Sequence, residues 1–533
     1  MPFHVRTSPA WLLRAILLGI LAFWLLEQMQ PVQMPALNLA AGERVQCVSY
    51  APYYKPGMTP FIENQTISPE QIDADLKALS PYAGCVRIYS IDQGLDQVVP
   101  TARKYGMKVL VGAWLGREEK KNALELSRAI ALVNQNQDVV RALIVGNEVL
   151  LRKDLSLEQL AAHIQNTKAQ SKVPVTYADV WEFWIRYDSL AKYVDLITAH
   201  ILPFWEDEPV NINHAMEHMR SIRGKVAEHF KDKSILIGET GWPSAGRQRE
   251  HSAATLVNEA RFMREFVALA RQEGWDYNFI EAVDQPWKRV LEGTVGGYWG
   301  FLDANLQPKF SLTAPVTERT SVSLQLSMGV LGAILCALLA AWRRAGKEHI
   351  ALSGLMGALA GVALSLQWEH AIVAYRNATE WTVLGGVSLL AICLPLCIAA
   401  SGGVLRAPAA DVAWQQWRQS DDRLASTNAI LRALLLFACA LGALWLLIDP
   451  RYRDFPSILY LIPALECALL PWLCRSKNAW SRAEGVSAAC LLLSVIGRWA
   501  SEPSNPQAIL WLSVGVAFAI PCLHHLWLTR KGY

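Results

Sequence analysis

The sequence predicts an α/β fold, a (β/α)8 barrel, followed by an α-helical polytopic membrane domain. Residues 320–533 are mostly apolar and hold only 11 of the 47 acidic residues, against 16 of the 50 basic ones. Residues 1–319 keep the other 36 acidic and 34 basic residues, which is the composition of a soluble domain. Within this first part, short β-branched runs alternate with amphipathic helical patterns, as in a barrel of parallel strands.

An apolar run near the start, Trp11–Leu26, is long enough to cross a bilayer and is interrupted only by Arg14. Arg6 precedes it, so we expect an uncleaved signal anchor, with a long cleavable signal peptide as the alternative. Further apolar stretches of spanning length follow the soluble part, at 324–342, 350–368, 382–400, 429–448, 456–474, 483–499 and 507–528.

Basic residues set the orientation of these segments, because cytoplasmic loops carry an excess of Lys and Arg. With the N-terminus inside, twelve bases fall on the inner side: Arg6, Arg343, Arg344, Lys347, Arg406, Arg418, Arg423, Arg475, Lys477, Arg482, Arg530 and Lys531. The outer loops carry at most four: Arg376, Arg451, Arg453 and Arg498. We therefore expect a cytoplasmic N-terminus and anchor at 1–39, a domain at 40–318 outside the cytoplasm, and about seven spans at 319–533. In a bacterial inner membrane the outer side is the periplasm.

Ionisable residues at membrane depth are functional candidates by default, and here they are Glu466, His524 and His525. The structural alternative is a Glu466 bonded to a neighbouring helix and a histidine pair near the inner interface. We expect the structural alternative for all three.

The soluble part yields an eight-strand pattern, with strands at 44–50, 84–90, 107–114, 142–148, 173–178, 194–200, 234–239 and 277–283. Helical patterns lie between them, at 69–79, 121–134, 157–169, 213–230 and 253–272. A doubly wound sheet is the alternative, but it normally has fewer strands and a Gly-rich first turn. Neither a dinucleotide-binding nor a P-loop glycine motif occurs, so we expect no nucleotide cofactor.

In a barrel of this kind the chemistry lies at the carboxyl ends of the strands. The residues at these ends are mainly polar or aromatic: Tyr50, Arg87, Tyr89, Trp114, Asn147, Glu148, Tyr177, His200, Glu239 and Glu281. Glu148 and Glu239 each close an apolar strand, and paired carboxylates across a pocket are the arrangement of glycosidases. Asn147 is placed to bind a sugar hydroxyl, and four rings are candidates for stacking on sugars: Phe204, Trp205, Trp242 and Trp287.

These motifs resemble glycoside hydrolase family 17, the β-1,3-glucanases and glucanosyltransferases. Ile144–Arg152 (IVGNEVLLR) is similar to the family's acid/base motif, and Gly238–Gly246 (GETGWPSAG) to its nucleophile motif. Shorter similarities lie at Val86–Tyr89, Phe279–Lys288 and Tyr298–Phe301, so that the resemblance spans about 42–310.

The resemblance implies retaining chemistry on β-glucan, with Glu148 as general acid/base and Glu239 as nucleophile. It also implies substrate-binding roles for the other strand-end residues and rings named above, Trp114 excepted. For such a pair we expect carboxyl groups about 5–5.5 Å apart and a raised pKa for Glu148 beside the like charge of Glu239. Plant members carry an acidic residue where this chain has Gly296, and we expect Glu281 to take its place.

Cys47 and Cys85 are the two cysteines outside the apolar part. We expect two buried, unpaired thiols, with a disulfide as the alternative in an oxidising compartment. His214 to His218 match an inverted zinc-protease pattern on a polar helix, which we interpret as a solvated face, so no metal is expected.

The expected function is therefore transfer of β-1,3-linked glucan (elongation, branching or closure) on the outer face of the membrane. The alternatives are a membrane-anchored β-1,3-glucan hydrolase and a glucan-binding assembly or export subunit. The expected partners are β-glucan, the lipid bilayer and a membrane glucan synthase. A net charge of only +3 excludes a nucleic-acid footprint.

Overall fold

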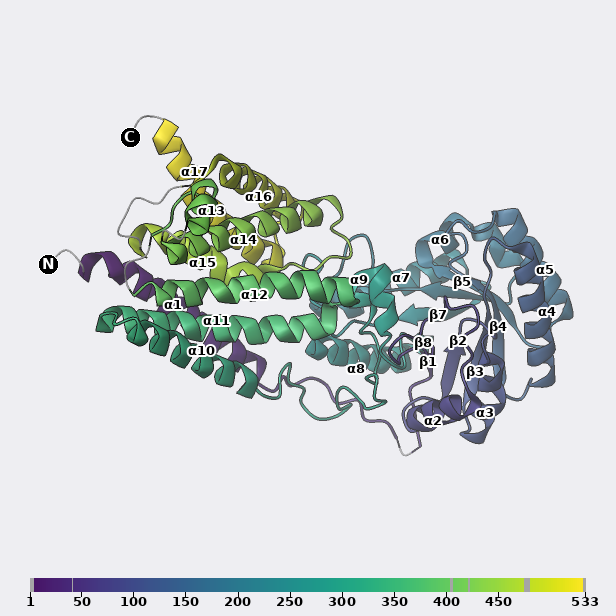
Figure 1. Ribbon diagram of the computed structural model, residues 1–533. Coiled ribbons are helices and arrows are strands. Elements are labelled where there is room, and N and C mark those ends of the chain that lie inside the picture. Colours follow the sequence, from purple (N-terminus) through teal and green to yellow (C-terminus); the bar gives the residue numbers. More distant parts are fainter. Residues whose placement is uncertain (1–3, 41, 403–405, 420–421, 474–479, 531–533) are drawn as a thin grey trace. The chain divides into compact units, whose positions relative to one another are not determined.

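The computed structural model describes residues 4–40, 42–402, 406–419, 422–473 and 480–530 (Figure 1). The chain divides into two compact units, a barrel unit of Pro31–Val316 and a helical unit made of Met1–Gln30 with Thr317–Tyr533. Three of the bases used for the orientation, Arg475, Lys477 and Lys531, lie outside the described residues.

The barrel unit is a closed parallel barrel whose strands follow sequence order, β1-β2-β3-β4-β5-β6-β7-β8. The prediction of a (β/α)8 barrel is confirmed, and a doubly wound sheet is excluded because β1 pairs with β8. The strands are β1 (Cys47–Ser49), β2 (Cys85–Ile88), β3 (Lys108–Ala113), β4 (Val140–Asn147), β5 (Val175–Val180), β6 (Leu196–His200), β7 (Ser234–Thr240) and β8 (Asp276–Phe279).

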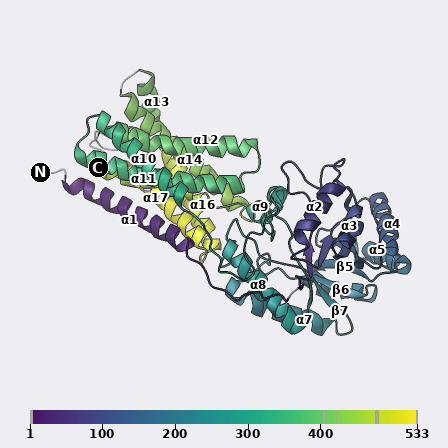
Figure 2. The ribbon, with the colours of Figure 1, turned by 90° about the horizontal axis from the view of Figure 1, so that it is seen from below.

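Helices surround the strands, as both ribbon views show (Figures 1 and 2). They are α2 (Pro69–Leu79), α3 (Val98–Lys104), α4 (Glu119–Gln135), α5 (Leu157–Gln170), α6 (Trp181–Arg186), α7 (Ala215–His229), α8 (Leu256–Glu273) and α9 (Arg289–Gly296). Local sequence explains where they begin: Ser68 caps α2 by accepting a hydrogen bond from the Gln71 amide, with Pro69 in the first turn.

Alternating strand residues form two separate cores. The larger core lies between the strands and the helices, and includes Val48, Val86 and Ile72. The smaller core takes one or two residues from most strands, which places it inside the barrel: Cys47, Cys85, Leu110, Ala142, Ile144, Ala178 and Leu236. Within it Cys47 and Cys85 form a disulfide, so the expectation of two unpaired thiols is wrong. The two cysteines lie on adjacent parallel strands, which brings their Cα atoms to 4.3 Å.

The two ends of the barrel unit lie against each other. Val32 and Val316 form an antiparallel bridge, and the Leu37 amide donates to the Leu312 carbonyl at 2.9 Å. Residues 31–39, which the sequence analysis joined to the anchor, therefore belong with the barrel unit. The barrel is an insertion in the chain between the first helix and the later apolar helices.

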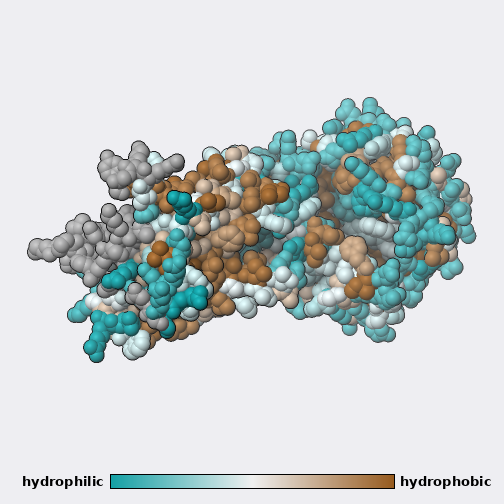
Figure 3. Space-filling view, turned by 45° about the horizontal axis from the view of Figure 1, so that its top comes forward, coloured by the Kyte–Doolittle hydropathy of each residue, from teal (hydrophilic) through white to brown (hydrophobic). Residues whose placement is uncertain are grey.

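The helical unit contains every apolar segment that the sequence analysis expected, as α1 (His4–Gln28), α10 (Ser323–Trp342), α11 (Lys347–Ala374), α12 (Ala378–Ala400), α14 (Arg423–Ile448), α15 (Ser457–Leu473), α16 (Arg482–Ser501) and α17 (Pro506–Arg530), with the short α13 (Ala410–Arg418) between α12 and α14. Among the described residues, seven helices are long and apolar enough to cross a membrane; the apolar part of α15 is shorter. The visible surface of the helical unit is largely apolar, whereas that of the barrel unit is largely hydrophilic (Figure 3).

A buried ion pair joins two helices of the helical unit. Arg14 on α1 donates through Nε to Glu466 Oε1 on α15 at 3.0 Å, and through Nη2 to the other carboxylate oxygen. Both side chains are 1% exposed. The arginine that interrupts the first apolar run is thus the partner of the glutamate at membrane depth, as the structural alternative expected for Glu466.

We expect Arg14→Leu to destabilise the full-length protein, because it leaves Glu466 as an unpaired buried charge, at a cost of about 3–5 kcal/mol. Replacing both Arg14 and Glu466 by Leu should recover most of this loss. Thermal unfolding in lipid nanodiscs measures both changes. The control is Arg376→Leu, which breaks an exposed pair with Glu380 and should cost less than about 1 kcal/mol. Equal losses in the single and double variants would contradict the pairing.

Candidate active site

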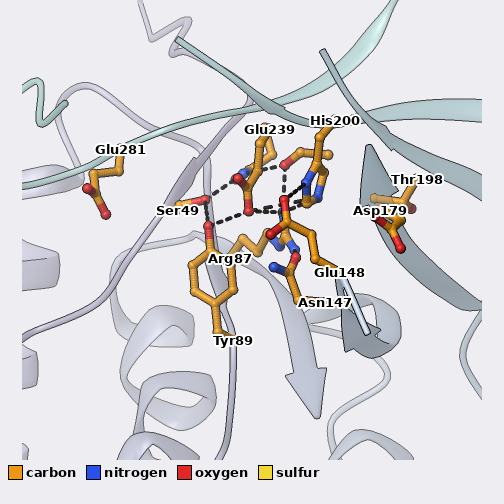
Figure 4. Close-up of polar contacts among 12 residues, drawn as sticks. Ser49, Arg87, Tyr89, Asn147, Glu148, Asp179, Thr198, His200, Glu239 and Glu281 are labelled. Atoms are coloured by element: carbon orange, nitrogen blue, oxygen red, sulfur yellow. Dashed lines mark hydrogen bonds and ion pairs between the residues drawn. The ribbon is translucent and has the colours of Figure 1, made fainter. Parts of the chain in front are cut away.

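Four strand ends bring a cluster of polar side chains together at one end of the barrel (Figure 4). Arg87 comes from β2, Asn147 and Glu148 from the end of β4, His200 from β6 and Glu239 from β7. One oxygen of Glu148, one oxygen of Glu239 and one ring nitrogen of His200 all lie within 4.8 Å of one another. The two carboxylates predicted from the sequence therefore meet in one site.

Glu239 lies at the bottom of this cluster and is 6% exposed. Its Oε1 accepts a hydrogen bond from the Tyr89 hydroxyl at 2.8 Å and one from Arg87 Nη1 at 3.2 Å. Both donors favour the ionised carboxylate, which is the form a nucleophile needs. Glu239 lies within the stretch Ile237–Thr240, where β7 shifts its register against β8.

Glu148 is directed into the site by a strained turn. Its φ is +52°, in the left-handed region that costs a non-glycine residue about 1–2 kcal/mol. Gly146 before it has φ +84°, and a Cβ there would lie 2.6 Å from the Val149 side chain. The turn is held by the Glu148 amide, which donates to the Ala178 carbonyl at 2.8 Å, and by the Arg152 amide, which donates to the Glu148 carbonyl at 2.8 Å.

Arg87 is the cation between the two carboxylates, with 1% of its surface exposed. Its Nη1 donates to the Gly238 carbonyl at 2.7 Å, and its Nη2 donates to Asn147 Oδ1 at 2.5 Å. The plane of the guanidinium lies over the Tyr89 ring at 4.6 Å. Arg87 thus fixes the orientation of the Asn147 amide and neutralises charge that would otherwise be buried without a partner.

The pKa of Glu148 is lowered, contrary to the expectation of a raised value. Burial acts to raise it, but the hydrogen bond from His200 and the positive charges of His200, Arg152 and Arg87 outweigh burial. The sequence analysis considered the like charge of Glu239 and missed these cations, which come from three other segments. A raised pKa occurs instead at Asp179 on β5, where burial, opposed by a hydrogen bond from Tyr177, brings it to about 6.

Comparisons with known proteins agree with this geometry. Residues 47–300 match the BtgE/BtgC glycoside hydrolase domain. The barrel unit is a glycoside hydrolase of the family 17 type. Relatives include a glucan 1,3-beta-glucosidase of Schizosaccharomyces pombe, 28% identical over 260 residues (45% of this chain, 79% of the relative), and one of Arthroderma benhamiae, 29% identical over 266 residues (46% and 85%).

A solved structure is also similar to this glycoside hydrolase. The family 17 β-1,3-glucanosyltransferase of Rhizomucor miehei is 26% identical and covers 51% of this chain and 98% of its own, with a TM-score of 0.44. The relatives and this structure cover about half of the chain, and the family model lies within the barrel unit.

Four predicted substrate-binding residues of the glycoside hydrolase are packed in its core. They are at most 1% exposed: Tyr50, Tyr177, Phe204 and Trp242. The Tyr50 hydroxyl donates to Asp75 on α2 at 2.7 Å, and the Trp242 indole donates to the Ala253 carbonyl at 2.9 Å. None of these rings offers a free face to a sugar, so we withdraw them as stacking platforms.

Two other predicted rings remain candidates because they are only partly buried. Trp205 stacks on Trp299 with ring centroids 6.0 Å apart, and Trp287 contacts the ring of Phe61 at 5.6 Å. A further exposed ring was not among the predicted binding residues: Trp114 after β3 is 42% exposed, and Arg152 lies 4.2 Å over its face. Its position at a strand end was the sequence signal that could have found it.

Glu281 is fully buried, and Lys288 Nζ donates to both of its oxygens at 2.8 and 3.0 Å. Burial raises the pKa of Glu281 to about 7. Another acidic residue, Glu292 on α9, interacts electrostatically with both Glu148 and Glu239. A Cβ on Gly296 would lie 2.4 Å from the Glu292 Cβ, so Glu292 fills the space next to position 296. The expectation that Glu281 alone replaces an acid at 296 is therefore incomplete.

Sequence reasoning also missed two small polar residues beneath the nucleophile. Ser49 Oγ lies 2.9 Å from the Tyr89 hydroxyl and accepts from Asn278 Nδ2 at 2.7 Å. Asn278 also donates to the Gly238 carbonyl at 2.8 Å. These contacts fix the direction of the Tyr89 hydroxyl toward Glu239. The sequence signal that could have found Ser49 and Asn278 is that both occupy strand positions whose side chains point into the barrel.

Glu148, His200 and Glu239 are also the described residues whose ligand atoms lie close enough to hold a metal ion. The Arg87 guanidinium is directed at the same space, 3.2 Å from Glu239 and 3.5 Å from the His200 ring, and would repel a cation there. The inverted zinc-protease pattern does not form a site: His214 and Glu217 are exposed on the surface, and His218 pairs with Glu206 at 2.8 Å. We keep the expectation of no metal and no cofactor.

We expect Gly296→Ala to destabilise the protein by about 1–3 kcal/mol, because the new methyl group meets the Glu292 side chain. Adding Glu292→Gly should relieve the clash and restore much of the stability, because it removes the Cβ atom that lies 2.4 Å from the new methyl group. The control is Gly116→Ala, since a Cβ at that glycine meets nothing within 4 Å. Thermal unfolding of the full chain measures the wild type, both single variants, the double variant and the control, and a strictly additive double variant would contradict the contact.

Proposed function

We propose that this enzyme transfers β-1,3-linked glucan through a covalent glycosyl-enzyme. The names of its relatives, glucan 1,3-beta-glucosidases, support the substrate class. A carboxylate oxygen of Glu239 forms a bond to the anomeric carbon while the bond to the leaving oxygen breaks, and Glu148 gives that oxygen its proton. Glu148 then removes a proton from an incoming sugar hydroxyl, whose oxygen displaces Glu239. Water in place of the sugar gives hydrolysis.

The observation that carries this proposal is the closeness of the two carboxylates. Retaining enzymes hold their carboxyl groups about 5–5.5 Å apart, whereas inverting enzymes leave about 6.5–9.5 Å for a water molecule. The oxygens of Glu148 and Glu239 that approach each other lie within 4.8 Å. This upper limit on the distance between the nearest oxygens fits the shorter spacing of retaining enzymes and supports a covalent intermediate.

Asn147 supports the same chemistry. Arg87 donates to its Oδ1, so its amide nitrogen is directed the other way and makes no hydrogen bond to another described residue. A donor beside the acid/base residue suits the sugar 2-hydroxyl, whose hydrogen bonds strengthen in the transition state. The Tyr89 hydroxyl and Arg87 both donate to Glu239 Oε1 and so hold that carboxylate in place for the attack.

We also propose that the enzyme acts at the outer face of a bacterial inner membrane. The charge asymmetry of twelve inner to four outer bases supports this orientation. The Cys47–Cys85 disulfide is a second, independent support, because disulfides persist in oxidising compartments such as the periplasm. At that face the enzyme would meet glucan as a membrane synthase releases it.

The acid step should make activity depend on pH in a stated direction. Because its neighbours lower the pKa of Glu148 in the free enzyme, its carboxyl is mostly ionised at neutral pH. The value of kcat/KM on laminari-oligosaccharides should therefore rise as pH falls from 8 toward 5, by up to about tenfold per pH unit. An activated aryl glucoside, which needs no acid, is the control and should show no such rise. A flat oligosaccharide profile would contradict the assignment.

The products of the full-length enzyme in detergent, incubated with laminari-oligosaccharides, test the proposed function. We expect products longer than the donor, and Trp287→Ala should raise the ratio of hydrolysis to transfer because an acceptor platform is lost. Mass spectrometry measures product lengths. The matched control is Trp275→Ala, a tryptophan directly before β8 at the opposite end of the barrel, which should leave the ratio unchanged. Release of only glucose and short oligosaccharides at high donor concentration would favour the hydrolase.

A further inference from the structure

His200 lies between the two carboxylates of the site. Its Nδ1 is 3.0 Å from Glu148 Oε1, and its Nε2 is 3.7 Å from Glu239 Oε1. The side chain is fully buried, and Figure 4 shows the ring beside both carboxylates. Neither proposed chemical step uses this histidine.

The ring has one orientation available to it. A Cβ on Gly238 would lie 2.8 Å from the His200 Cδ2 atom and 2.6 Å from Thr198 Cγ2, so only glycine at 238 lets the ring pack there. On the other side, Arg87 Nη1 stands 3.5 Å from His200 Nε2. The imidazole is held between Gly238 on β7 and the Arg87 guanidinium, which keep it from turning away from Glu148.

The neighbours of the ring place a proton on Nδ1. The Arg87 guanidinium only donates and offers Nε2 no acceptor, and Glu239 Oε1 lies 3.7 Å from Nε2, beyond hydrogen-bond distance. The Glu148 carboxylate oxygen lies 3.0 Å from Nδ1, so Nδ1–H donates to it. Other charged or titratable groups act on this trio from the surrounding elements: Arg152, Asp179, Tyr89, Lys288 and Glu292.

We propose that His200 is a positioning residue that decides which oxygen of Glu148 exchanges protons with the substrate. Because Nδ1–H occupies Oε1, the acid proton must lie on Oε2, which makes no hydrogen bond to any residue in the described part of the chain. The inference rests on the proposed function, since it matters only if Glu148 is the acid/base. Without His200 the carboxyl group can turn and present its proton in the wrong direction.

Two substitutions separate the two ring nitrogens. An asparagine amide nitrogen occupies about the position of Nδ1, whereas a glutamine amide nitrogen reaches about the position of Nε2. His200→Asn thus keeps the hydrogen-bond donor to Glu148. His200→Gln places its amide nitrogen near Arg87 and Glu239 and removes the donor to Glu148. Neither side chain titrates, so both also remove any charge on the ring.

The test compares kcat/KM of the full-length enzyme on a laminari-oligosaccharide, which needs the acid, and on dinitrophenyl β-laminaribioside, which does not. We expect His200→Ala and His200→Gln to lose about 10- to 100-fold on the oligosaccharide and less than about threefold on the aryl substrate. His200→Asn should stay within about threefold of wild type on both. The ratio of the two values does not depend on how much protein is folded, and His214→Asn, on the exposed surface, is the control.

Equal losses on both substrates, or rescue by glutamine as good as rescue by asparagine, would overturn the inference while the proposed function stands. A wild-type enzyme that turns over neither substrate would overturn the proposed function, and the inference would fall with it. A selective oligosaccharide loss that only asparagine repairs supports the assignment of Oε2 as the proton-transfer atom.

Discussion

The site depends on the buried guanidinium of Arg87. Two carboxylates held within 4.8 Å of each other repel, and their burial at the end of a barrel is costly unless a cation lies between them. Arg87 meets this requirement by donating to Glu239, Asn147 and the Gly238 carbonyl. The same contacts fix the Asn147 amide beside Glu148 and hold the Glu239 carboxylate in place. One side chain on β2 thus orders groups from both β4 and β7.

Main-chain irregularities at the strand ends make room for this arrangement. Glu148 has a positive φ after β4, and registers slip where β6 pairs with β7 and where β7 pairs with β8. Gly238 brings β7 against the His200 ring with no side chain between them. These irregularities interrupt the regular inward and outward alternation of side chains at the strand ends that carry Glu148, His200 and Glu239. Such interruptions are common where a rigid scaffold carries a functional site.

The regular features could be predicted from the sequence and these irregular ones could not. Eight alternating runs predict the barrel, and the two glutamates after apolar strands predict the catalytic pair. Tyr50 and Tyr177 also lie near strand ends, yet both are packed in the core between strands and helices. Successive residues of a strand point to opposite faces, so these tyrosines point outward while their neighbours Ser49 and Ala178 point into the barrel. A shift of one residue reverses this parity, and residue types alone do not reveal it. The contacts of Arg87 with His200 and with Glu239 join separate strands, so they could be seen only in the folded chain.

The same principle of pairing buried charge operates in the helical unit. Arg14 and Glu466 each interrupt an otherwise apolar helix, and each satisfies the other. A second buried pair, Arg432 Nη2 with Glu484 Oε1 at 2.7 Å, joins α14 to α16. Loss of α1 would leave Glu466 unpaired among apolar helices, so the ion pair makes α1 a component of the fold of the helical unit. Because either charge alone would be costly there, the pair specifies that α1 packs against α15.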